Sequence, residues 1–196
     1  MPNLTAFLSY VFVTTFTPGP NNIMAMTNGN QFGFKKALNF ILGVTTGFAI
    51  IMLLCNYLNL LLFNLMPKVG VLMKLLGSIY IIYLAVKILK STSDENGSPS
   101  DNMSTFLTGI TMQFVNPKVI LYGITVTSNF IIPYYKSNIT LFLFSIFLAF
   151  VGFLSTCCWA LFGAVFQKFL SEYRKAFNIL MALLLIYSAI SILDIF

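Results

Sequence analysis

Histidine is absent from this 196-residue sequence, and charged residues of any kind are scarce. They make up 8% of the chain, against about a quarter in an ordinary soluble domain. Hydrolases and transferases need a base, paired carboxylates or a metal site, and the apolar segments offer none of these groups. The sequence therefore predicts no enzyme, no catalytic residue, no metal site and no cofactor. All acidic residues fall in connections or near chain ends: Asp94, Glu95, Asp101, Glu172 and Asp194.

Apolar residues in long runs dominate what is present. They account for 58% of the chain, and the mean hydropathy is +0.89. A helix needs ~20 apolar residues to cross ~30 Å of hydrocarbon, and several charge-free runs exceed that length. No basic region with a small-residue cleavage site precedes the first run, so we expect that run to remain in the protein. The sequence predicts an all-α polytopic membrane protein with six transmembrane helices, roughly 4–28, 37–59, 69–89, 104–132, 139–166 and 176–195.

Lysine and arginine are divided unevenly between the two sides of this predicted bundle. Basic connections remain in the cytoplasm, so the richer side is expected to be cytoplasmic and both termini outside. The net charge of +6 then reflects contact with the bilayer, and no nucleic-acid partner is expected. Lys74 lies near the start of segment 69–89, where a long side chain can extend to the interface. The first, third and fifth connections carry Lys35, Lys36, Lys87, Lys90, Lys168, Arg174 and Lys175, and the other side carries Lys68, Lys74 and Lys136.

The two halves of the chain resemble each other. Residues 81–89, IIYLAVKIL, match residues 185–193, LIYSAISIL, at five of nine positions, and each stretch is the last helix of its half. Three helices per half is an odd number, so a duplicated half must enter the membrane from the opposite side. We therefore expect two inverted three-helix repeats, 1–89 and 104–196. A polar cytoplasmic linker, 90–103, joins them.

Prolines interrupt the first helix of each half. In TPGPNN, proline removes a helical hydrogen bond and clashes with the preceding turn, so the helix must break or kink, and it can restart at the second proline. In VNPK, asparagine is a good N-cap and proline a good first helical residue. Two helix N-termini with unpaired N–H groups are then expected near the middle of the membrane. The predicted substrate-binding residues are Pro18, Gly19, Pro20, Asn21, Asn22, Gln113, Asn116, Pro117 and Lys118.

Lys118 is the one formal charge expected deep in a membrane segment, where charge is costly and usually functional. Beside a helix restart, its natural counter-ion is a carboxylate. With no buried acid to pair a second positive charge, a neutral zwitterion fits better than a basic amino acid. Purely structural roles remain open as alternatives at this point. The prolines would then only kink their helices, Lys118 would face the interface or a water-filled crevice, and the amides would only link neighbouring helices by hydrogen bonds.

Two other residue types need an interpretation. Gly43 and Gly47 have the spacing that lets membrane helices pack closely, and motion between the halves could use the same surface.

Cys55 and the pair Cys157–Cys158 lie at corresponding places in the two halves, which keeps a membrane thiol–disulfide electron carrier as an alternative function. No C-x-x-C motif accompanies them.

TPGPNN, followed by Gly33, Lys35–Lys36, Gly43 and Gly47, resembles the signature of the LysE/RhtB family of bacterial amino-acid exporters. The resemblance covers essentially the whole chain. Residues 40–55, 113–133 and 158–167 are most similar to the subgroup that exports cysteine and O-acetylserine. The resemblance implies secondary-active export of small neutral amino acids or their derivatives, by alternating access, across the bacterial cytoplasmic (inner) membrane.

The same resemblance implies coupling to the proton gradient. Many family members carry an acidic residue after the glycine that corresponds to Gly47, whereas this chain has Phe48. Without a buried carboxylate, Lys118 or the substrate itself is left to carry a proton. The expected partners are a small amino-acid substrate and the lipid bilayer, and a homodimer is left open.

Overall fold

The computed structural model describes residues 4–90 and 105–193, and this part of the chain is helical without strands. Each predicted helical segment is found as a helix or as a broken helix. The elements are α1 (Leu4–Phe16), α2 (Pro20–Phe32), α3 (Phe34–Tyr57), α4 (Asn59–Lys90), α5 (Phe106–Val115), α6 (Pro117–Val126), the π-helix η2 (Thr127–Ile131), α7 (Asn138–Val165), α8 (Gln167–Glu172) and α9 (Arg174–Ile192).

Several boundaries differ from the prediction. Helix α4 begins at Asn59 rather than at residue 69, because its backbone remains helical through Pro67 and Lys68, ahead of the predicted start. Helix α2 extends to Phe32 and ends at Gly33, whose φ of 78° suits glycine. The short helix α8 was not predicted. The predicted linker, 90–103, lies outside the described residues except for Lys90, the last residue of α4.

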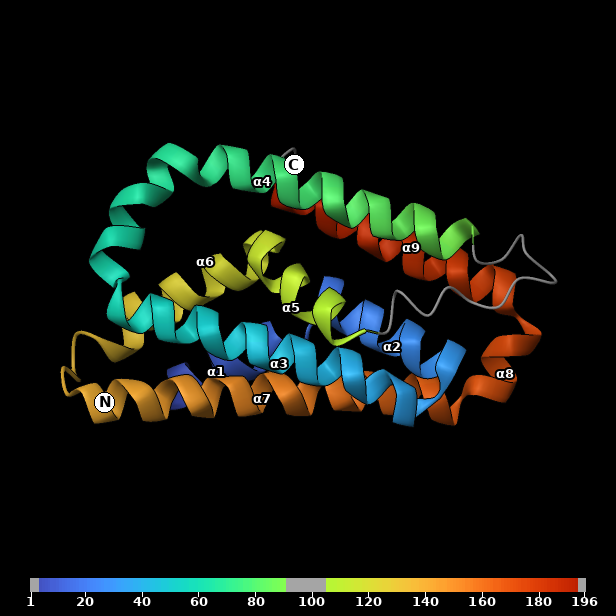
Figure 1. Cartoon of the computed structure of the whole chain (residues 1–196), viewed down its shortest axis with the longest axis horizontal. Coiled ribbons are helices and arrows are strands. Elements are labelled where there is room, and N and C mark those ends of the chain that lie inside the picture. The colour runs from blue at the N-terminus through green and yellow to red at the C-terminus, as the bar shows by residue number, and fades with distance from the viewer. Residues whose placement is uncertain (1–3, 91–104, 194–196) are drawn as a thin grey trace.

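The helices form a layered, elongated bundle (Figure 1). Helix α4 packs along α9 on one side, and α3 packs along α7 on the other. The broken helices lie between these pairs, with α2 against α7 and α5 against α3. The connections α2–α3 and α7–α9 and the end of α4 lie at one end, whereas α1 and α7 begin at the opposite end. Alternate connections therefore share an end.

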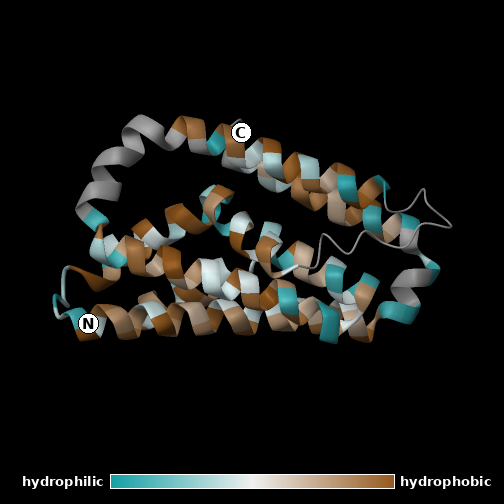
Figure 2. Ribbon diagram, viewed as in Figure 1, coloured by the Kyte–Doolittle hydropathy of each residue, from teal (hydrophilic) through white to brown (hydrophobic). Residues whose placement is uncertain are grey.

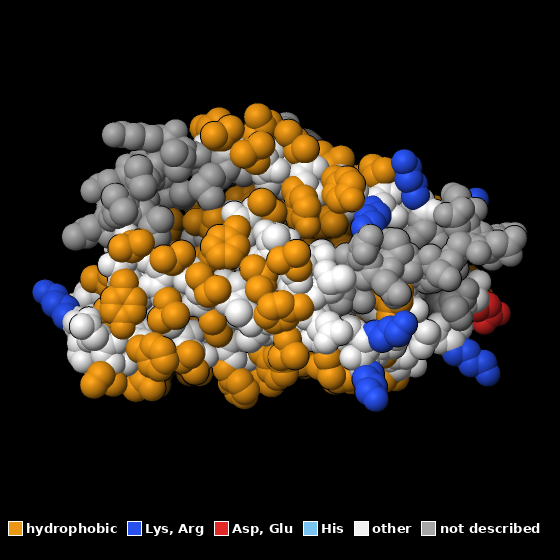
Figure 3. Space-filling model, viewed as in Figure 1, with side chains coloured by type: hydrophobic (Ala, Val, Ile, Leu, Met, Phe, Trp, Pro, Cys, Tyr) orange, Lys and Arg blue, Asp and Glu red, His pale blue; other side chains and the backbone are white. Residues whose placement is uncertain are grey.

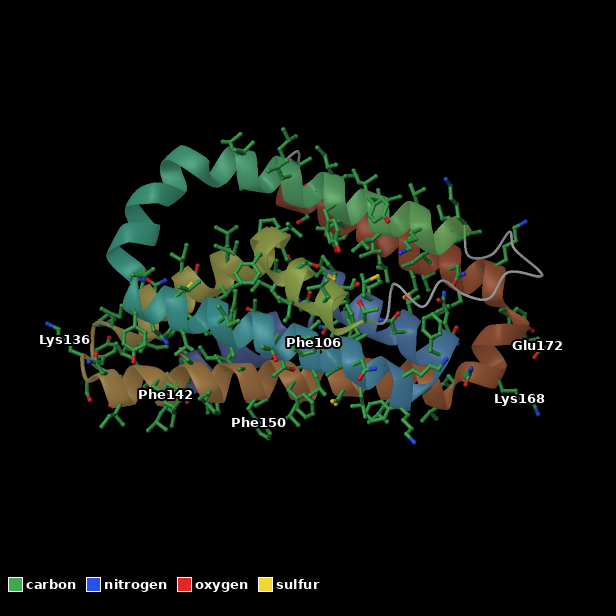
Figure 4. The ribbon with its side chains drawn as sticks, viewed as in Figure 1. Phe106, Lys136, Phe142, Phe150, Lys168 and Glu172 are labelled. Atoms are coloured by element: carbon green, nitrogen blue, oxygen red, sulfur yellow. The ribbon has the colours of Figure 1, made fainter. Side chains whose placement is uncertain are left out.

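The outer surface of the bundle is apolar along its middle. Hydrophobic side chains cover the visible face, and Lys and Arg gather towards one end (Figure 3), while hydrophilic residues are concentrated near both ends (Figure 2). Phe142 and Phe150 point away from the bundle, with 48% and 55% of their surface exposed (Figure 4). Helices α3 and α7 are long and apolar enough to cross a membrane, with hydropathy of 2.2 and 2.3. Such a surface favours contact with lipid rather than water.

Glycines allow the tightest helix crossings. A Cβ added to Gly43 in α3 would overlap the carbonyl of Phe106 in α5, and one added to Gly109 would overlap the carbonyl of Phe40. Gly29 and Gly163 bring α2 and α7 together in the same way. The backbones are in direct contact at both crossings, which holds each broken helix against a long continuous one.

Candidate functional site

The break between α1 and α2 comprises Thr17, Pro18 and Gly19. The end of a helix leaves carbonyls without intrahelical partners, and here side chains bind them. The Asn22 amide donates to the carbonyls of Thr15 (2.9 Å) and Thr17 (3.0 Å). Two residues of α7 contribute as well: Ser155 donates to Thr15 (3.0 Å), and the Trp159 indole donates to the carbonyl of Phe16 (3.3 Å). The break is therefore a defined structure held by another helix.

The second break is a single residue, Asn116, between α5 and α6. Its side chain accepts a hydrogen bond from the backbone N–H of Lys118 at 3.1 Å, and Pro117 is the first residue of α6. The predicted N-cap and helix restart are confirmed.

Three amides connect the two breaks. Asn21 donates to Gln113 at 2.8 Å, Gln113 donates back to Asn21 at 3.1 Å, and Asn116 donates to the same Asn21 oxygen at 3.3 Å. Gln113 and Asn116 are buried. The cluster fixes α2 against α5 and α6, so the two restarts have a defined relative position.

Lys118 reaches from the second break to the first. Its ammonium donates to the Thr17 hydroxyl at 3.2 Å. Gly19 has extended backbone that other residues can adopt, with φ of −169°. Its lack of a side chain matters for another reason: an added Cβ would lie 2.9 Å from the Lys118 ammonium. Glycine leaves room for the charge to lie directly against the break.

A cavity of about 60 Å³ lies between the breaks. By comparison, about 10–15 Å³ of such space accommodates one water molecule. The N-terminus of α2 faces this cavity, and no side chain in the described part of the chain caps it. Of the described residues that line the cavity, none is acidic. The cavity is lined by Thr14, Thr15, Gly19, Pro20, Asn21, Asn22, Val44, Thr45, Phe48, Asn116, Lys118, Val119, Tyr122, Gly152 and Thr156.

Aromatic rings form one wall of the cavity. Tyr122 stacks on Tyr10 with ring centroids 5.8 Å apart, and its other neighbour, Phe48, is also at 5.8 Å. The Tyr122 ring is 5% exposed, and its hydroxyl makes no hydrogen bond of normal geometry within the described residues. The hydroxyl lies near Thr15, which also lines the cavity.

Most of the predicted site residues line this cavity, namely Gly19, Pro20, Asn21, Asn22, Asn116 and Lys118. Gln113 supports it through Asn21, Pro117 starts α6 beside it, and Pro18 lines a second, adjacent cavity. Gly47 also lies against the site, because a Cβ there would approach the Gln113 side chain within 2.8 Å.

Sequence reasoning did not assign the remaining lining residues to the site. Tyr122 lies one helical turn beyond Lys118, and helical spacing from that lysine was a signal that could have identified it. Thr14 and Thr15 directly precede the proline break. The sequence carried no signal for Thr45, Gly152 and Thr156. These residues line the cavity only because α3 and α7 pack against the broken helices.

The cysteines lie away from both cavities. Cys55 is buried in the cluster around Phe7 and Met52, whereas Cys157 packs against the other hydrophobic cluster and Cys158 is exposed. All of them are free thiols. A thiol–disulfide carrier gains no support from this arrangement.

Known sequences are clearly related to this chain. Residues 12–194 match the family described as LysE type translocator. The protein named "Cysteine/O-acetylserine efflux protein" of Escherichia coli O139:H28 (strain E24377A / ETEC) is 39% identical over 189 residues, which cover 96% of each chain. Proteins of that name from Escherichia coli (strain K12) and Shigella sonnei (strain Ss046) are 38% identical with the same coverage. No solved structure matches the chain.

A family match over nearly the whole length agrees with the resemblance carried by TPGPNN, and it makes the protein a transporter rather than an enzyme. The chain belongs to the LysE type translocator family of membrane proteins.

Proposed function

We propose that the protein exports a small neutral amino acid or derivative, of the cysteine and O-acetylserine class, from the cytoplasm. The observation that carries this proposal is the cavity between the two breaks, which combines the Lys118 ammonium with the uncapped N-terminus of α2 and has no acidic lining residue. Both groups favour an anion of carboxylate size. The names of the curated relatives support the substrate class and the direction.

On this proposal the substrate carboxylate lies against Lys118 and the backbone N–H groups that begin α2. Asn21 and Asn116 position these groups, since their amides bond to one another or to Gln113. Asn22 stabilises the break itself, because its amide donates to two carbonyls. The roles of Pro18, Pro20 and Pro117 are to end and restart the helices.

Threonine hydroxyls offer acceptors for the substrate ammonium. Thr45 donates its hydroxyl proton to the carbonyl of Ile41 at 2.8 Å, and Thr156 donates to Gly152 at 3.0 Å. With their protons engaged within their own helices, their oxygens can only accept from a ligand. Two or three such acceptors suit one ammonium group, whereas a second positive charge would be buried without an acid.

The proposed architecture is six membrane spans in two inverted repeats. The spans are α1 with α2, α3, α4, α5 with α6, α7 and α9. The antiparallel pairs α3–α7 and α4–α9 join corresponding helices of the two halves, as a two-fold relation in the membrane plane requires. Repeats of 1–89 and 104–196 joined by the linker 90–103 fit these pairings. Alternating access would move one half against the other around the breaks.

We propose that the basic end of the bundle faces the cytoplasm and that both termini are outside. Lys168 and Glu172 lie at the end where α2 meets α3, and Lys136 lies at the opposite end (Figure 4). The excess of lysine and arginine at the first end supports this orientation in the bacterial inner membrane.

Export against a gradient also needs an energy source, for which we propose the proton gradient. No acidic residue lines the cavity, so the proton would move with the substrate or on Lys118. Dissipating the gradient with a protonophore should abolish accumulation while leaving exchange of substrate across the membrane intact.

Inside-out vesicles test the function directly. We expect uptake of labelled cysteine and O-acetylserine, a weaker response to larger neutral amino acids, and no uptake of lysine. Uptake should depend on Lys118 and Asn21. If no neutral amino acid enters, or if Lys118→Ala and Asn21→Ala transport like the unaltered protein, the proposal is wrong.

A further inference from the structure

A second cavity lies beside the first and is larger, with a volume of about 370 Å³. Helices α1, α4, α6 and α9 contribute to it, so it connects the α4–α9 pair with the breaks. Among the residues that the structure describes, none that lines it is acidic. They are Tyr10, Thr14, Pro18, Pro20, Lys74, Lys118, Leu121, Tyr122, Thr125, Tyr187, Ser188 and Ser191.

Lys74 gives this cavity a positive charge of its own. The sequence suggested that Lys74 lies near a helix end and extends to the interface. Because α4 begins at Asn59 and ends at Lys90, Lys74 instead lies near the middle of that helix, half-buried and facing the cavity. Charges at such a depth are costly and usually mark a pathway.

Two ammonium groups, those of Lys74 and Lys118, therefore line one cavity. Each ammonium group can donate hydrogen bonds to an anion that enters this space. The hydroxyls of Tyr122, Thr125 and Ser188 line the same space. Charge and hydroxyl groups together suit a carboxylate.

The two cavities share a wall. Thr14, Pro20, Lys118 and Tyr122 line both. From this wall the second cavity extends along α6 to Thr125 and along α1 to Tyr10, away from the end that carries most of the lysines. A substrate that leaves the first cavity towards that side would enter the second without losing contact with Lys118.

We propose that the second cavity is a substrate-binding site on the exit path, which we call the exit station. In it, Lys74 binds the carboxylate of the transported amino acid after Lys118 releases it. This proposal rests on the proposed export function and on the orientation given with it. It makes Lys74 a substrate-binding residue that acts on the outward-facing side only, whereas Lys118 acts on both.

Exchange of labelled cysteine in proteoliposomes of known orientation, under reducing conditions, tests the station. Lys74→Gln should raise the half-saturation concentration for external cysteine about tenfold, the size of one hydrogen bond to a charged group. The half-saturation concentration for cysteine on the cytoplasmic side should change by less than about twofold. Lys118→Gln should raise both values, and Lys74→Arg, which keeps the charge, should restore most of the external affinity.

Two control variants separate substrate binding by Lys74 from a general effect of lost charge and from an ion pair. Lys136→Gln removes a lysine outside both cavities and should change neither value. Asp194→Asn removes the acid that follows α9 in the sequence, and if it reproduces Lys74→Gln, an ion pair accounts for the effect and the station is wrong. An unchanged external value in Lys74→Gln, with transport still dependent on Lys118, also overturns the station alone. Failure of the unaltered protein to exchange cysteine would overturn the export proposal instead.

Discussion

At the scale of single residues, the site depends on how closely the Lys118 ammonium approaches the backbone of the first break. Lys118 lies against the first break beside Gly19, whose lack of a side chain leaves room for the ammonium. A polar contact of this kind combines electrostatic attraction with hydrogen bonding to Thr17, and both need a short distance. The glycine of TPGPNN is thus part of the binding geometry, while its prolines shape the helix.

Gly19→Ala should therefore impair transport more than folding. The new Cβ would lie 2.9 Å from the ammonium and force Lys118 away from Thr17, although the extended backbone accepts alanine. We expect a loss of about tenfold in apparent affinity, equivalent to about 1.4 kcal/mol. Thermal denaturation in detergent should remain within a few degrees of the unaltered protein. A variant that transports normally would contradict this role of Gly19.

Two glycines in α3 should respond differently to the same change. A Cβ at Gly43 meets the backbone carbonyl of Phe106, which cannot move without separating α3 from α5. At Gly47 the nearest atom belongs to the flexible Gln113 side chain. We expect Gly43→Ala to lower the yield and melting temperature, and Gly47→Ala to fold but weaken substrate binding through Gln113 and Asn21. Equal effects of the two variants on stability would refute the distinction.

At the scale of helices, the breaks are the elements that make a site possible. Asn22→Ala should destabilise the first break, because it removes two part-buried hydrogen bonds, to the carbonyls of Thr15 and Thr17. Each such hydrogen bond contributes about 0.5–1.5 kcal/mol. Ser155→Ala should cost less, since Thr15 keeps its bond to Asn22. Chemical denaturation in detergent measures both, and a larger effect for Ser155→Ala would rule out this ordering.

The breaks were predictable from sequence because proline acts locally. Pro18, Pro20 and Pro117 each fix the backbone near themselves, so TPGPNN and VNPK indicate a restart whatever surrounds them. The start of α4 had no such signal: the sequence predicted it at residue 69, whereas the helix begins at Asn59, and this hid the central position of Lys74. Contacts between distant helices, such as Thr45 and Thr156 meeting the breaks, have no local signal at all.

At the scale of the whole molecule, the proposed orientation can be tested by labelling. In a background with Ser at Cys55, Cys157 and Cys158, a cysteine placed at Lys136 should react with a membrane-impermeant thiol reagent in intact cells. One placed at Lys168 should react only in inside-out vesicles, because the basic end faces the cytoplasm. The opposite pattern would reverse the proposed direction of the bundle.

The same background tests whether thiols take part. Since no cysteine lines either cavity, the triple serine variant should transport with a rate within about twofold of the unaltered protein. Loss of activity in this variant, together with normal transport by Lys118→Ala, would favour an electron carrier over an exporter.

The central claim is that the cavity between the breaks holds the carboxylate of a neutral amino acid against Lys118. The most direct measurement is exchange in proteoliposomes, comparing cysteine with its methyl ester, which lacks the carboxylate charge, in the unaltered protein and in Lys118→Gln. We predict that cysteine exchanges and its ester does not, and that Lys118→Gln loses most of this preference. Equal exchange of both compounds by the unaltered protein, or a preference that survives in Lys118→Gln, would contradict the claim.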